Sequence, residues 1–157
     1  MDTFILYYKI YNKTVVSKDY ISWAFHMLEN NHSSYSINVL SSLSEAVNIF
    51  EVEDYFRRAA KEIQLQQPSY QVCSIHYLQH LATQILLDET HAIDLAYEIY
   101  EVMRELDDTP NYKTWYEISE LIDDYRYGDN PTNLTMPALI ISIQRASKQL
   151  LQYKEEA

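Results

Sequence analysis

The chain has 157 residues, 47% of them hydrophobic, so it is long enough for one domain with a sizeable core. Its single glycine disfavours sheets, whose turns rely on glycine, and excludes Rossmann and P-loop nucleotide sites, while its single cysteine excludes an internal disulfide. Its formal net charge of −11 disfavours nucleic-acid phosphates and anionic membranes, so neither is expected as a partner.

Capping residues and apolar periodicity predict an all-α fold. The predicted helices are 2–12, 18–30, 35–43, 49–63, 68–87, 91–106, 112–127 and 135–153. The first is weak and the third is either a short helix or a turn, so we expect a single-domain bundle of about seven helices over residues 1–157, or a short irregular armadillo-like stack. The residues expected to delimit these helices are Ser17, Ser34, Asn48 and Thr90 as N-caps and Gly128 as a stop.

The same features indicate a cytoplasmic protein. Residues 1–9 lack the basic stretch and the long apolar stretch of a secretion signal. No apolar run approaches the ~18 residues that a membrane-spanning helix needs. The lone cysteine, Cys73, suits a reducing compartment.

Nearly all of the net charge lies between Asp88 and Asp129. This segment holds 13 acidic residues and three basic ones, whereas the rest of the chain holds ten acidic and nine basic residues. Such a local excess produces a surface field, and a surface field acts on a charged partner. We therefore predict a non-enzymatic binding protein whose partner is a basic protein.

The acidic residues of this segment follow helical spacing. In the sixth predicted helix they recur every three or four residues, which places them within an arc of about 80°. Those of the seventh helix also share one side. We call this set the acidic face, and its members are Asp94, Glu98, Glu101, Glu105, Asp108, Glu117, Glu120 and Asp124. The tyrosines expected to anchor a partner at its edge are Tyr97, Tyr112, Tyr116 and Tyr127.

A comparison with the fourth helix favours a binding role. There Glu53 stands four residues before Arg57 and Asp54 four before Arg58, a spacing that neutralises a solvated helix. On the sixth helix, acidic residues at this spacing repel one another by roughly 0.2–0.5 kcal/mol per pair. The alternative is that the acidic face is only a solvated surface that keeps the protein dispersed.

A second pattern raises the alternative of a metal-dependent helical enzyme. Cys73, His76 and His80 share the fifth helix with C-x2-H-x3-H spacing, and histidines four residues apart can share a metal. No second Cys/His pair completes a structural zinc site, so a core cysteine with two partly exposed histidines is the simpler interpretation. We expect no metal and no cofactor. A non-catalytic adaptor domain is the remaining alternative.

Two segments carry a resemblance to known proteins. They are NIFEVEDYF, residues 48–56, and DDYRYGDN, residues 123–130. With its size and acidity, the chain resembles the immunity proteins of bacterial toxin systems, which are small, acidic and cytoplasmic. The resemblance implies an inhibitor that neutralises a cationic toxin domain. If that toxin is a nuclease, the acidic residues would occupy the site where substrate phosphates bind.

Overall fold

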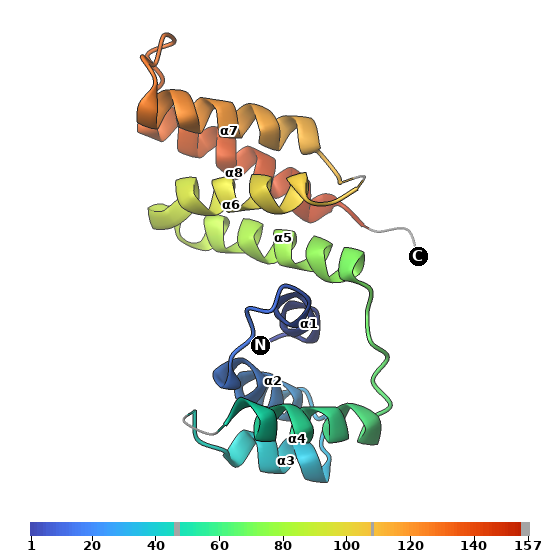
Figure 1. The fold of residues 1–157 in the computed structure, drawn as a ribbon. Helices are drawn as coiled ribbons and strands as arrows, with labels where there is room; N and C mark the ends of the chain where they lie inside the picture. The colour runs from blue at the N-terminus through green and yellow to red at the C-terminus, as the bar shows by residue number, and fades with distance from the viewer. Residues whose placement is uncertain (46–47, 108, 155–157) are drawn as a thin grey trace. The chain divides into compact units, whose positions relative to one another are not determined.

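The computed structural model describes residues 1–45, 48–107 and 109–154. Throughout these ranges it contains helices and no strand, which confirms the predicted all-α fold (Figure 1). In chain order the elements are α1 (Thr3–Tyr11), α2 (Ser17–Glu29), α3 (Tyr35–Ser42), α4 (Ile49–Glu62), α5 (Tyr70–Leu87), the short 3-10 helix η1 (Glu89–His91), α6 (Ala92–Arg104), α7 (Tyr112–Tyr127) and α8 (Met136–Gln152). The predicted bounds agree with these to within about two residues. None of the described helices is long and apolar enough to cross a membrane.

Within this helical domain the chain forms two compact units, a subdivision that the sequence did not predict. Unit 1 is residues 1–74 and unit 2 is residues 75–157. Each unit has its own cluster of buried apolar side chains. Each cluster also contains one of the two tryptophans, Trp23 in unit 1 and Trp115 in unit 2, and both are fully buried.

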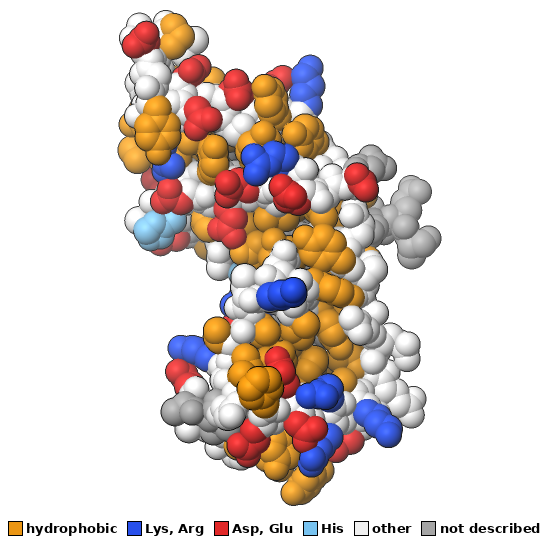
Figure 2. All heavy atoms as spheres, in the orientation of Figure 1, with side chains coloured by type: hydrophobic (Ala, Val, Ile, Leu, Met, Phe, Trp, Pro, Cys, Tyr) orange, Lys and Arg blue, Asp and Glu red, His pale blue; other side chains and the backbone are white. Residues whose placement is uncertain are grey.

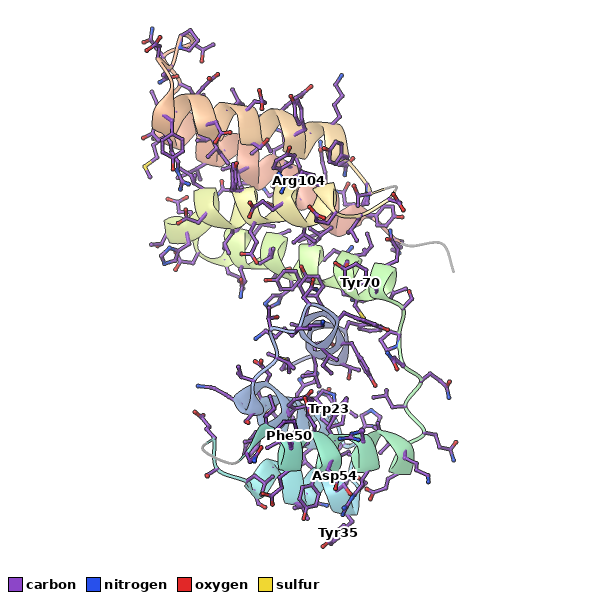
Figure 3. All side chains as sticks on the ribbon, viewed as in Figure 1. Trp23, Tyr35, Phe50, Asp54, Tyr70 and Arg104 are labelled. Carbon is purple, nitrogen blue, oxygen red and sulfur yellow. The ribbon has the colours of Figure 1, made fainter. Side chains whose placement is uncertain are left out.

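The core of unit 1 is built around aromatic rings. Phe56 of α4 packs edge-on against Trp23 of α2, with ring centroids 4.9 Å apart. The Trp23 side chain is labelled in Figure 3. Its indole N–H donates to the Thr3 hydroxyl of α1 at 3.0 Å, so its polar atom is satisfied although buried. The buried residues of α4 recur with helical spacing at Val52, Phe56 and Ala59, which explains why this helix turns one face inward.

A nearly buried ion pair joins α1 to the start of α2. The Lys9 ammonium lies 2.7 Å from Oδ1 of Asp19, whose side chain is only 8% exposed. The other carboxylate oxygen, Oδ2, accepts the backbone N–H of Val16 at 2.9 Å. Asp19 therefore stabilises the first turn of α2 and the contact between the two helices together.

The core of unit 2 is aliphatic around Trp115. The buried residues of α8 fall at Leu139, Ile143, Ala146 and Leu150, a spacing of three or four that forms one stripe. In the contacts of the structure, α6 packs against both α7 and α8. Thr135 caps α8, because its hydroxyl accepts the N–H of Ala138.

Two of the predicted caps are wrong. Ser17 is the first residue of α2, and Val16 takes the cap position. Thr90 lies inside η1, whose capping residue is Asp88, because the Asp88 carboxylate accepts the Thr90 N–H at 3.0 Å. The N-cap position of α6 itself is taken by His91. Ser34 and Asn48 do cap their helices as predicted. In both places the helical segment begins at or before the residue that the sequence predicted as its cap.

Gly128 ends α7 as predicted, but without the left-handed backbone that usually explains a glycine there. Its φ is −96°, and a Cβ at this position would lie 3.0 Å from the Asp124 Cα. Glycine is favoured here because a Cβ would crowd the backbone of the preceding turn. The positions with positive φ in the described residues are instead Lys13, Asn31, Gln64, Asn111, Asn130 and Asn133.

Candidate functional site

The acidic face lies on an antiparallel pair of helices in unit 2. Near the end of α6, the ring of Tyr100 contacts Tyr112 and Tyr116 of α7. Near the start of α6, Asp94 forms an ion pair with Arg126 from the end of α7. The predicted side-by-side arrangement of these helices is therefore present. Figure 2 shows red carboxylate side chains over both α6 and α7 on one face.

Most of the predicted acidic residues are exposed. Glu101, Glu105, Glu117, Glu120 and Asp124 all project into solvent. Asp108 lies outside the described residues. Glu105 follows the last residue of α6, so it marks the end of the acidic row.

Glu98 differs from its neighbours on the acidic face. It is half-buried, and its carboxylate accepts the Tyr77 hydroxyl of α5 at 2.5 Å. Because this contact joins α5 to α6, Glu98 has a structural role within unit 2, as Asp94 does through its ion pair with Arg126 of α7.

The acidic segment does contain compensating ion pairs, contrary to the sequence-based interpretation. Arg126 of α7 pairs with Asp94 of α6, so this ion pair joins two helices. The remaining pairs are Arg104 Nε with Glu105 Oε1 at 3.6 Å and Lys113 Nζ with Glu117 Oε1 at 3.8 Å. These pairs are largely exposed and each adds little stability. Since the segment has three basic residues against 13 acidic ones, the surface stays strongly negative.

The contrast with the fourth helix is also only partly correct. Arg58 does pair with Asp54. Glu53, however, accepts the hydroxyl of Tyr20 at 3.3 Å, and within the described residues Arg57 makes no ion pair. The spacing of four residues permitted the pair, but a tertiary contact to α2 replaced it.

A tyrosine cluster lies along the contact between α6 and α7. Its members are Tyr97, Tyr100, Tyr112 and Tyr116. The ring of Tyr100 is central, with centroids 6.1 to 6.3 Å from the other three. The guanidinium of Arg104, which is labelled in Figure 3, lies 5.9 Å from the centroid of the Tyr100 ring. Tyr112 and Tyr116 remain 39% and 43% exposed, so the cluster is available to a partner.

The sequence predicted three members of this cluster but missed Tyr100 and Arg104. The signal that could have found them is their spacing, since Tyr97, Tyr100 and Arg104 follow one another at three and four residues. Tyr127 was also predicted, and it is 83% exposed at the opposite end of α7 from Tyr112.

The negative field acts on the phenols of the cluster. The carboxylate of Asp123 raises the pKa of Tyr97 above its usual value. Desolvation by the neighbouring rings raises the pKa of Tyr112 in the same direction. Phenols are protonated at neutral pH even without these shifts, so both can donate hydrogen bonds to a partner.

The residues of the alternative metal site are not brought together. Cys73 is fully buried in the core of unit 1, and burial raises the pKa of its thiol to about 11. His76 and His80 are exposed residues of unit 2, where the ring of His80 stacks on Tyr77. Among the described residues, no group of three or more His, Cys, Asp or Glu side chains could hold a metal ion.

Comparisons of the chain with protein-family models, with curated proteins and with solved structures gave no match. No family is assigned, and the resemblance to immunity proteins stays an expectation. Function is inferred from the chemistry of the acidic face and the tyrosine cluster.

Proposed function

We propose that this chain is a protein-binding inhibitor of the immunity type, whose acidic face covers a basic surface of a bacterial toxin domain. One observation carries the proposal: exposed carboxylates on α6 and α7 flank a tyrosine cluster that is itself partly exposed. Carboxylates attract a basic partner over distance and fix its register. Tyrosines supply rigid, amphipathic anchors at the centre of an interface.

The tyrosine cluster favours binding over a surface that is only solvated. Charged residues alone suffice to keep a protein dispersed. Tyr112 and Tyr116 leave large apolar areas in water, and aromatic residues are enriched in interfaces relative to the rest of a protein surface. Because Tyr100 packs against both, the two rings are held in place before a partner arrives.

The proposed partner presents lysines and arginines. A nuclease is the simplest example, because its substrate-binding surface must be basic to hold phosphates. Carboxylates spaced along α6 and α7 would pair with those same cations and exclude the substrate. This inhibition needs no catalytic group in the chain itself.

The test neutralises carboxylates that make no ion pair within the described residues. The variant is Glu101→Gln/Glu120→Gln, and the matched control is Glu29→Gln/Glu51→Gln, which removes the same charge from unit 1 and also breaks no ion pair within the described residues. Basic proteins retained at low salt by the wild type and the control, but lost by the acidic-face variant, are identified by mass spectrometry. Each is then purified and its activity assayed with and without the wild-type chain.

We expect the acidic-face variant to associate with such a partner about tenfold or more slowly at low salt. The rate for the wild type should fall with ionic strength more steeply than that of the variant. Equal on-rates and equal salt dependence for the variant and the control would show that the acidic face is only solvated. A partner whose activity is unaffected by binding would refute inhibition.

A further inference from the structure

Unit 1 contains a groove that the proposed inhibitor function does not use. It has a volume of about 610 Å³ and is formed by α1, α2, α4 and the segment 64–67 that follows α4. All of its lining residues belong to unit 1. Small-molecule sites in proteins typically have volumes of about 300–1,000 Å³, so the groove is large enough for a metabolite-sized ligand.

The floor of the groove is aromatic and fixed. Tyr7, Tyr20 and Phe56 line it, and each is at most 7% exposed. The Phe56 ring lies 5.8 Å from that of Tyr7 and 5.1 Å from that of Tyr20. Because these rings pack against one another in the core, the small parts of them that reach the groove are held rigidly and can contact an apolar part of a ligand.

The rim of the groove is cationic, which is unusual in a chain with a net charge of −11. Arg57 and Lys61 lie one turn apart on α4, and both are exposed. Within the described residues, neither forms an ion pair with a carboxylate. The spacing of Glu53 and Arg57 would allow one, but Glu53 accepts the Tyr20 hydroxyl instead. On the face shown in Figure 2, basic side chains border the hydrophobic side chains of unit 1.

The net charge of the lining residues indicates the sign of the charge that the ligand carries. With Arg57, Lys61 and Glu53 all lining the groove, the lining has a net charge of +1. A single negative charge is matched by this arrangement, whereas a second one would be repelled by Glu53. Arginine also forms paired hydrogen bonds with a carboxylate in one plane.

We propose that this groove binds a small aromatic monocarboxylate. Its ring lies against Tyr7, Tyr20 and Phe56, and its carboxylate pairs with Arg57 and Lys61. The site is separate from the acidic face, so the proposal does not depend on the inhibitor function.

The test uses 4-(trifluoromethyl)phenylacetate as the probe, with fluorine NMR to measure binding. Its neutral amide is the matched ligand control. The variant Arg57→Gln/Lys61→Gln removes the rim cations, and Arg58→Gln is the matched protein control, because Arg58 lies on the same helix but pairs with Asp54 and does not line the groove. Ala60→Phe fills the groove without removing a core side chain.

We expect the wild type and Arg58→Gln to bind the acid with a dissociation constant on the order of 1 mM or tighter. Arg57→Gln/Lys61→Gln should bind it about tenfold or more weakly. Ala60→Phe should abolish binding while circular dichroism shows that it remains folded. If Ala60→Phe fails to fold, Ala60→Leu provides the same steric test.

Three results would overturn the proposal. The first is no binding of the acid to the wild type at 10 mM, a concentration about tenfold above the expected limit. The second is equal affinity for the acid and its amide, which would make the groove a nonspecific apolar surface. The third is a loss of binding free energy in Arg58→Gln that is half of the loss in Arg57→Gln/Lys61→Gln or more, which would reflect the number of charges removed rather than the rim.

Discussion

Asp19 allows the sharpest test of how unit 1 is stabilised. Replacing it with alanine removes two contacts at once, the ion pair to Lys9 at 2.7 Å and the hydrogen bond from the Val16 N–H at 2.9 Å. A charge-assisted hydrogen bond contributes about 1.5–3 kcal/mol, and a capping bond about 1 kcal/mol. We expect Asp19→Ala to lower the free energy of unfolding of unit 1 by about 3 kcal/mol. Domains are typically stable by only about 5–15 kcal/mol, so the change is large.

A double-mutant cycle separates the two contacts. Lys9→Met keeps the Val16 hydrogen bond but leaves the Asp19 carboxylate without its cation, at an expected cost of about 2 kcal/mol. This value is below the 3–5 kcal/mol of a fully buried pair, because the Lys9 side chain is 30% exposed. The double variant should be more stable than the sum of the single effects predicts, by about 1–2 kcal/mol.

The assay uses the two tryptophans. Trp23 belongs to unit 1 and Trp115 to unit 2, so in a Trp115→Phe background the fluorescence reports unit 1 alone. Urea denaturation then gives the free energy of unfolding of each variant. A loss below about 1 kcal/mol for Asp19→Ala, or a cycle with no coupling, would refute the stabilising role of the ion pair.

Three further predictions concern other sites. Tyr116→Ala should speed dissociation from a basic partner about tenfold or more, since central aromatics mainly govern the off-rate, whereas Tyr35→Ala on unit 1 should not; equal off-rates would exclude the tyrosine cluster as an anchor. Ile143→Ala, in the core of unit 2, should cost about 2–5 kcal/mol by urea denaturation, and a cost below about 1 kcal/mol would mean that this core is loosely packed. Burial raises the folded-state pKa of Cys73 from 9.0 to about 11. The contribution of the protonated thiol to the free energy of unfolding is therefore complete below about pH 9 and is lost as the pH rises towards 11. Cys73→Ala should therefore lose less stability than the wild type across that range, and identical pH profiles would contradict this.

Local signals explain what could be predicted from the sequence. The caps at Ser34 and Asn48 and the exposed row that includes Glu101 all depend on residues within one or two turns of each other. Such patterns are readable because helical periodicity is the same in every protein. The cap predicted at Thr90 is wrong because Thr90 lies inside η1, a short 3-10 helix that precedes α6.

Tertiary contacts explain what could not be predicted. Arg126 and Asp94 are 32 residues apart, so their ion pair appears only when α6 and α7 are placed side by side. Glu53 has a suitable partner four residues away on its own helix and still bonds Tyr20, 33 residues distant. In both cases a tertiary contact decides which partner a charged residue takes, although the spacing along its own helix allows another. In the second case, the rim of the groove remains cationic as a result.

The positions of positive φ bear on how this chain could change over evolution. Lys13 has a φ of 58° at the end of α1, a conformation that costs a residue with a side chain roughly 1–2 kcal/mol and costs glycine almost nothing. A substitution of Lys13 by glycine would therefore remove this cost, but it would give back about 0.5–1 kcal/mol because glycine raises the conformational entropy of the unfolded chain. A codon change to glycine at this single site is thus a neutral or stabilising step. The stability gained in this way could offset destabilising substitutions that arise on a binding surface as its partner diverges.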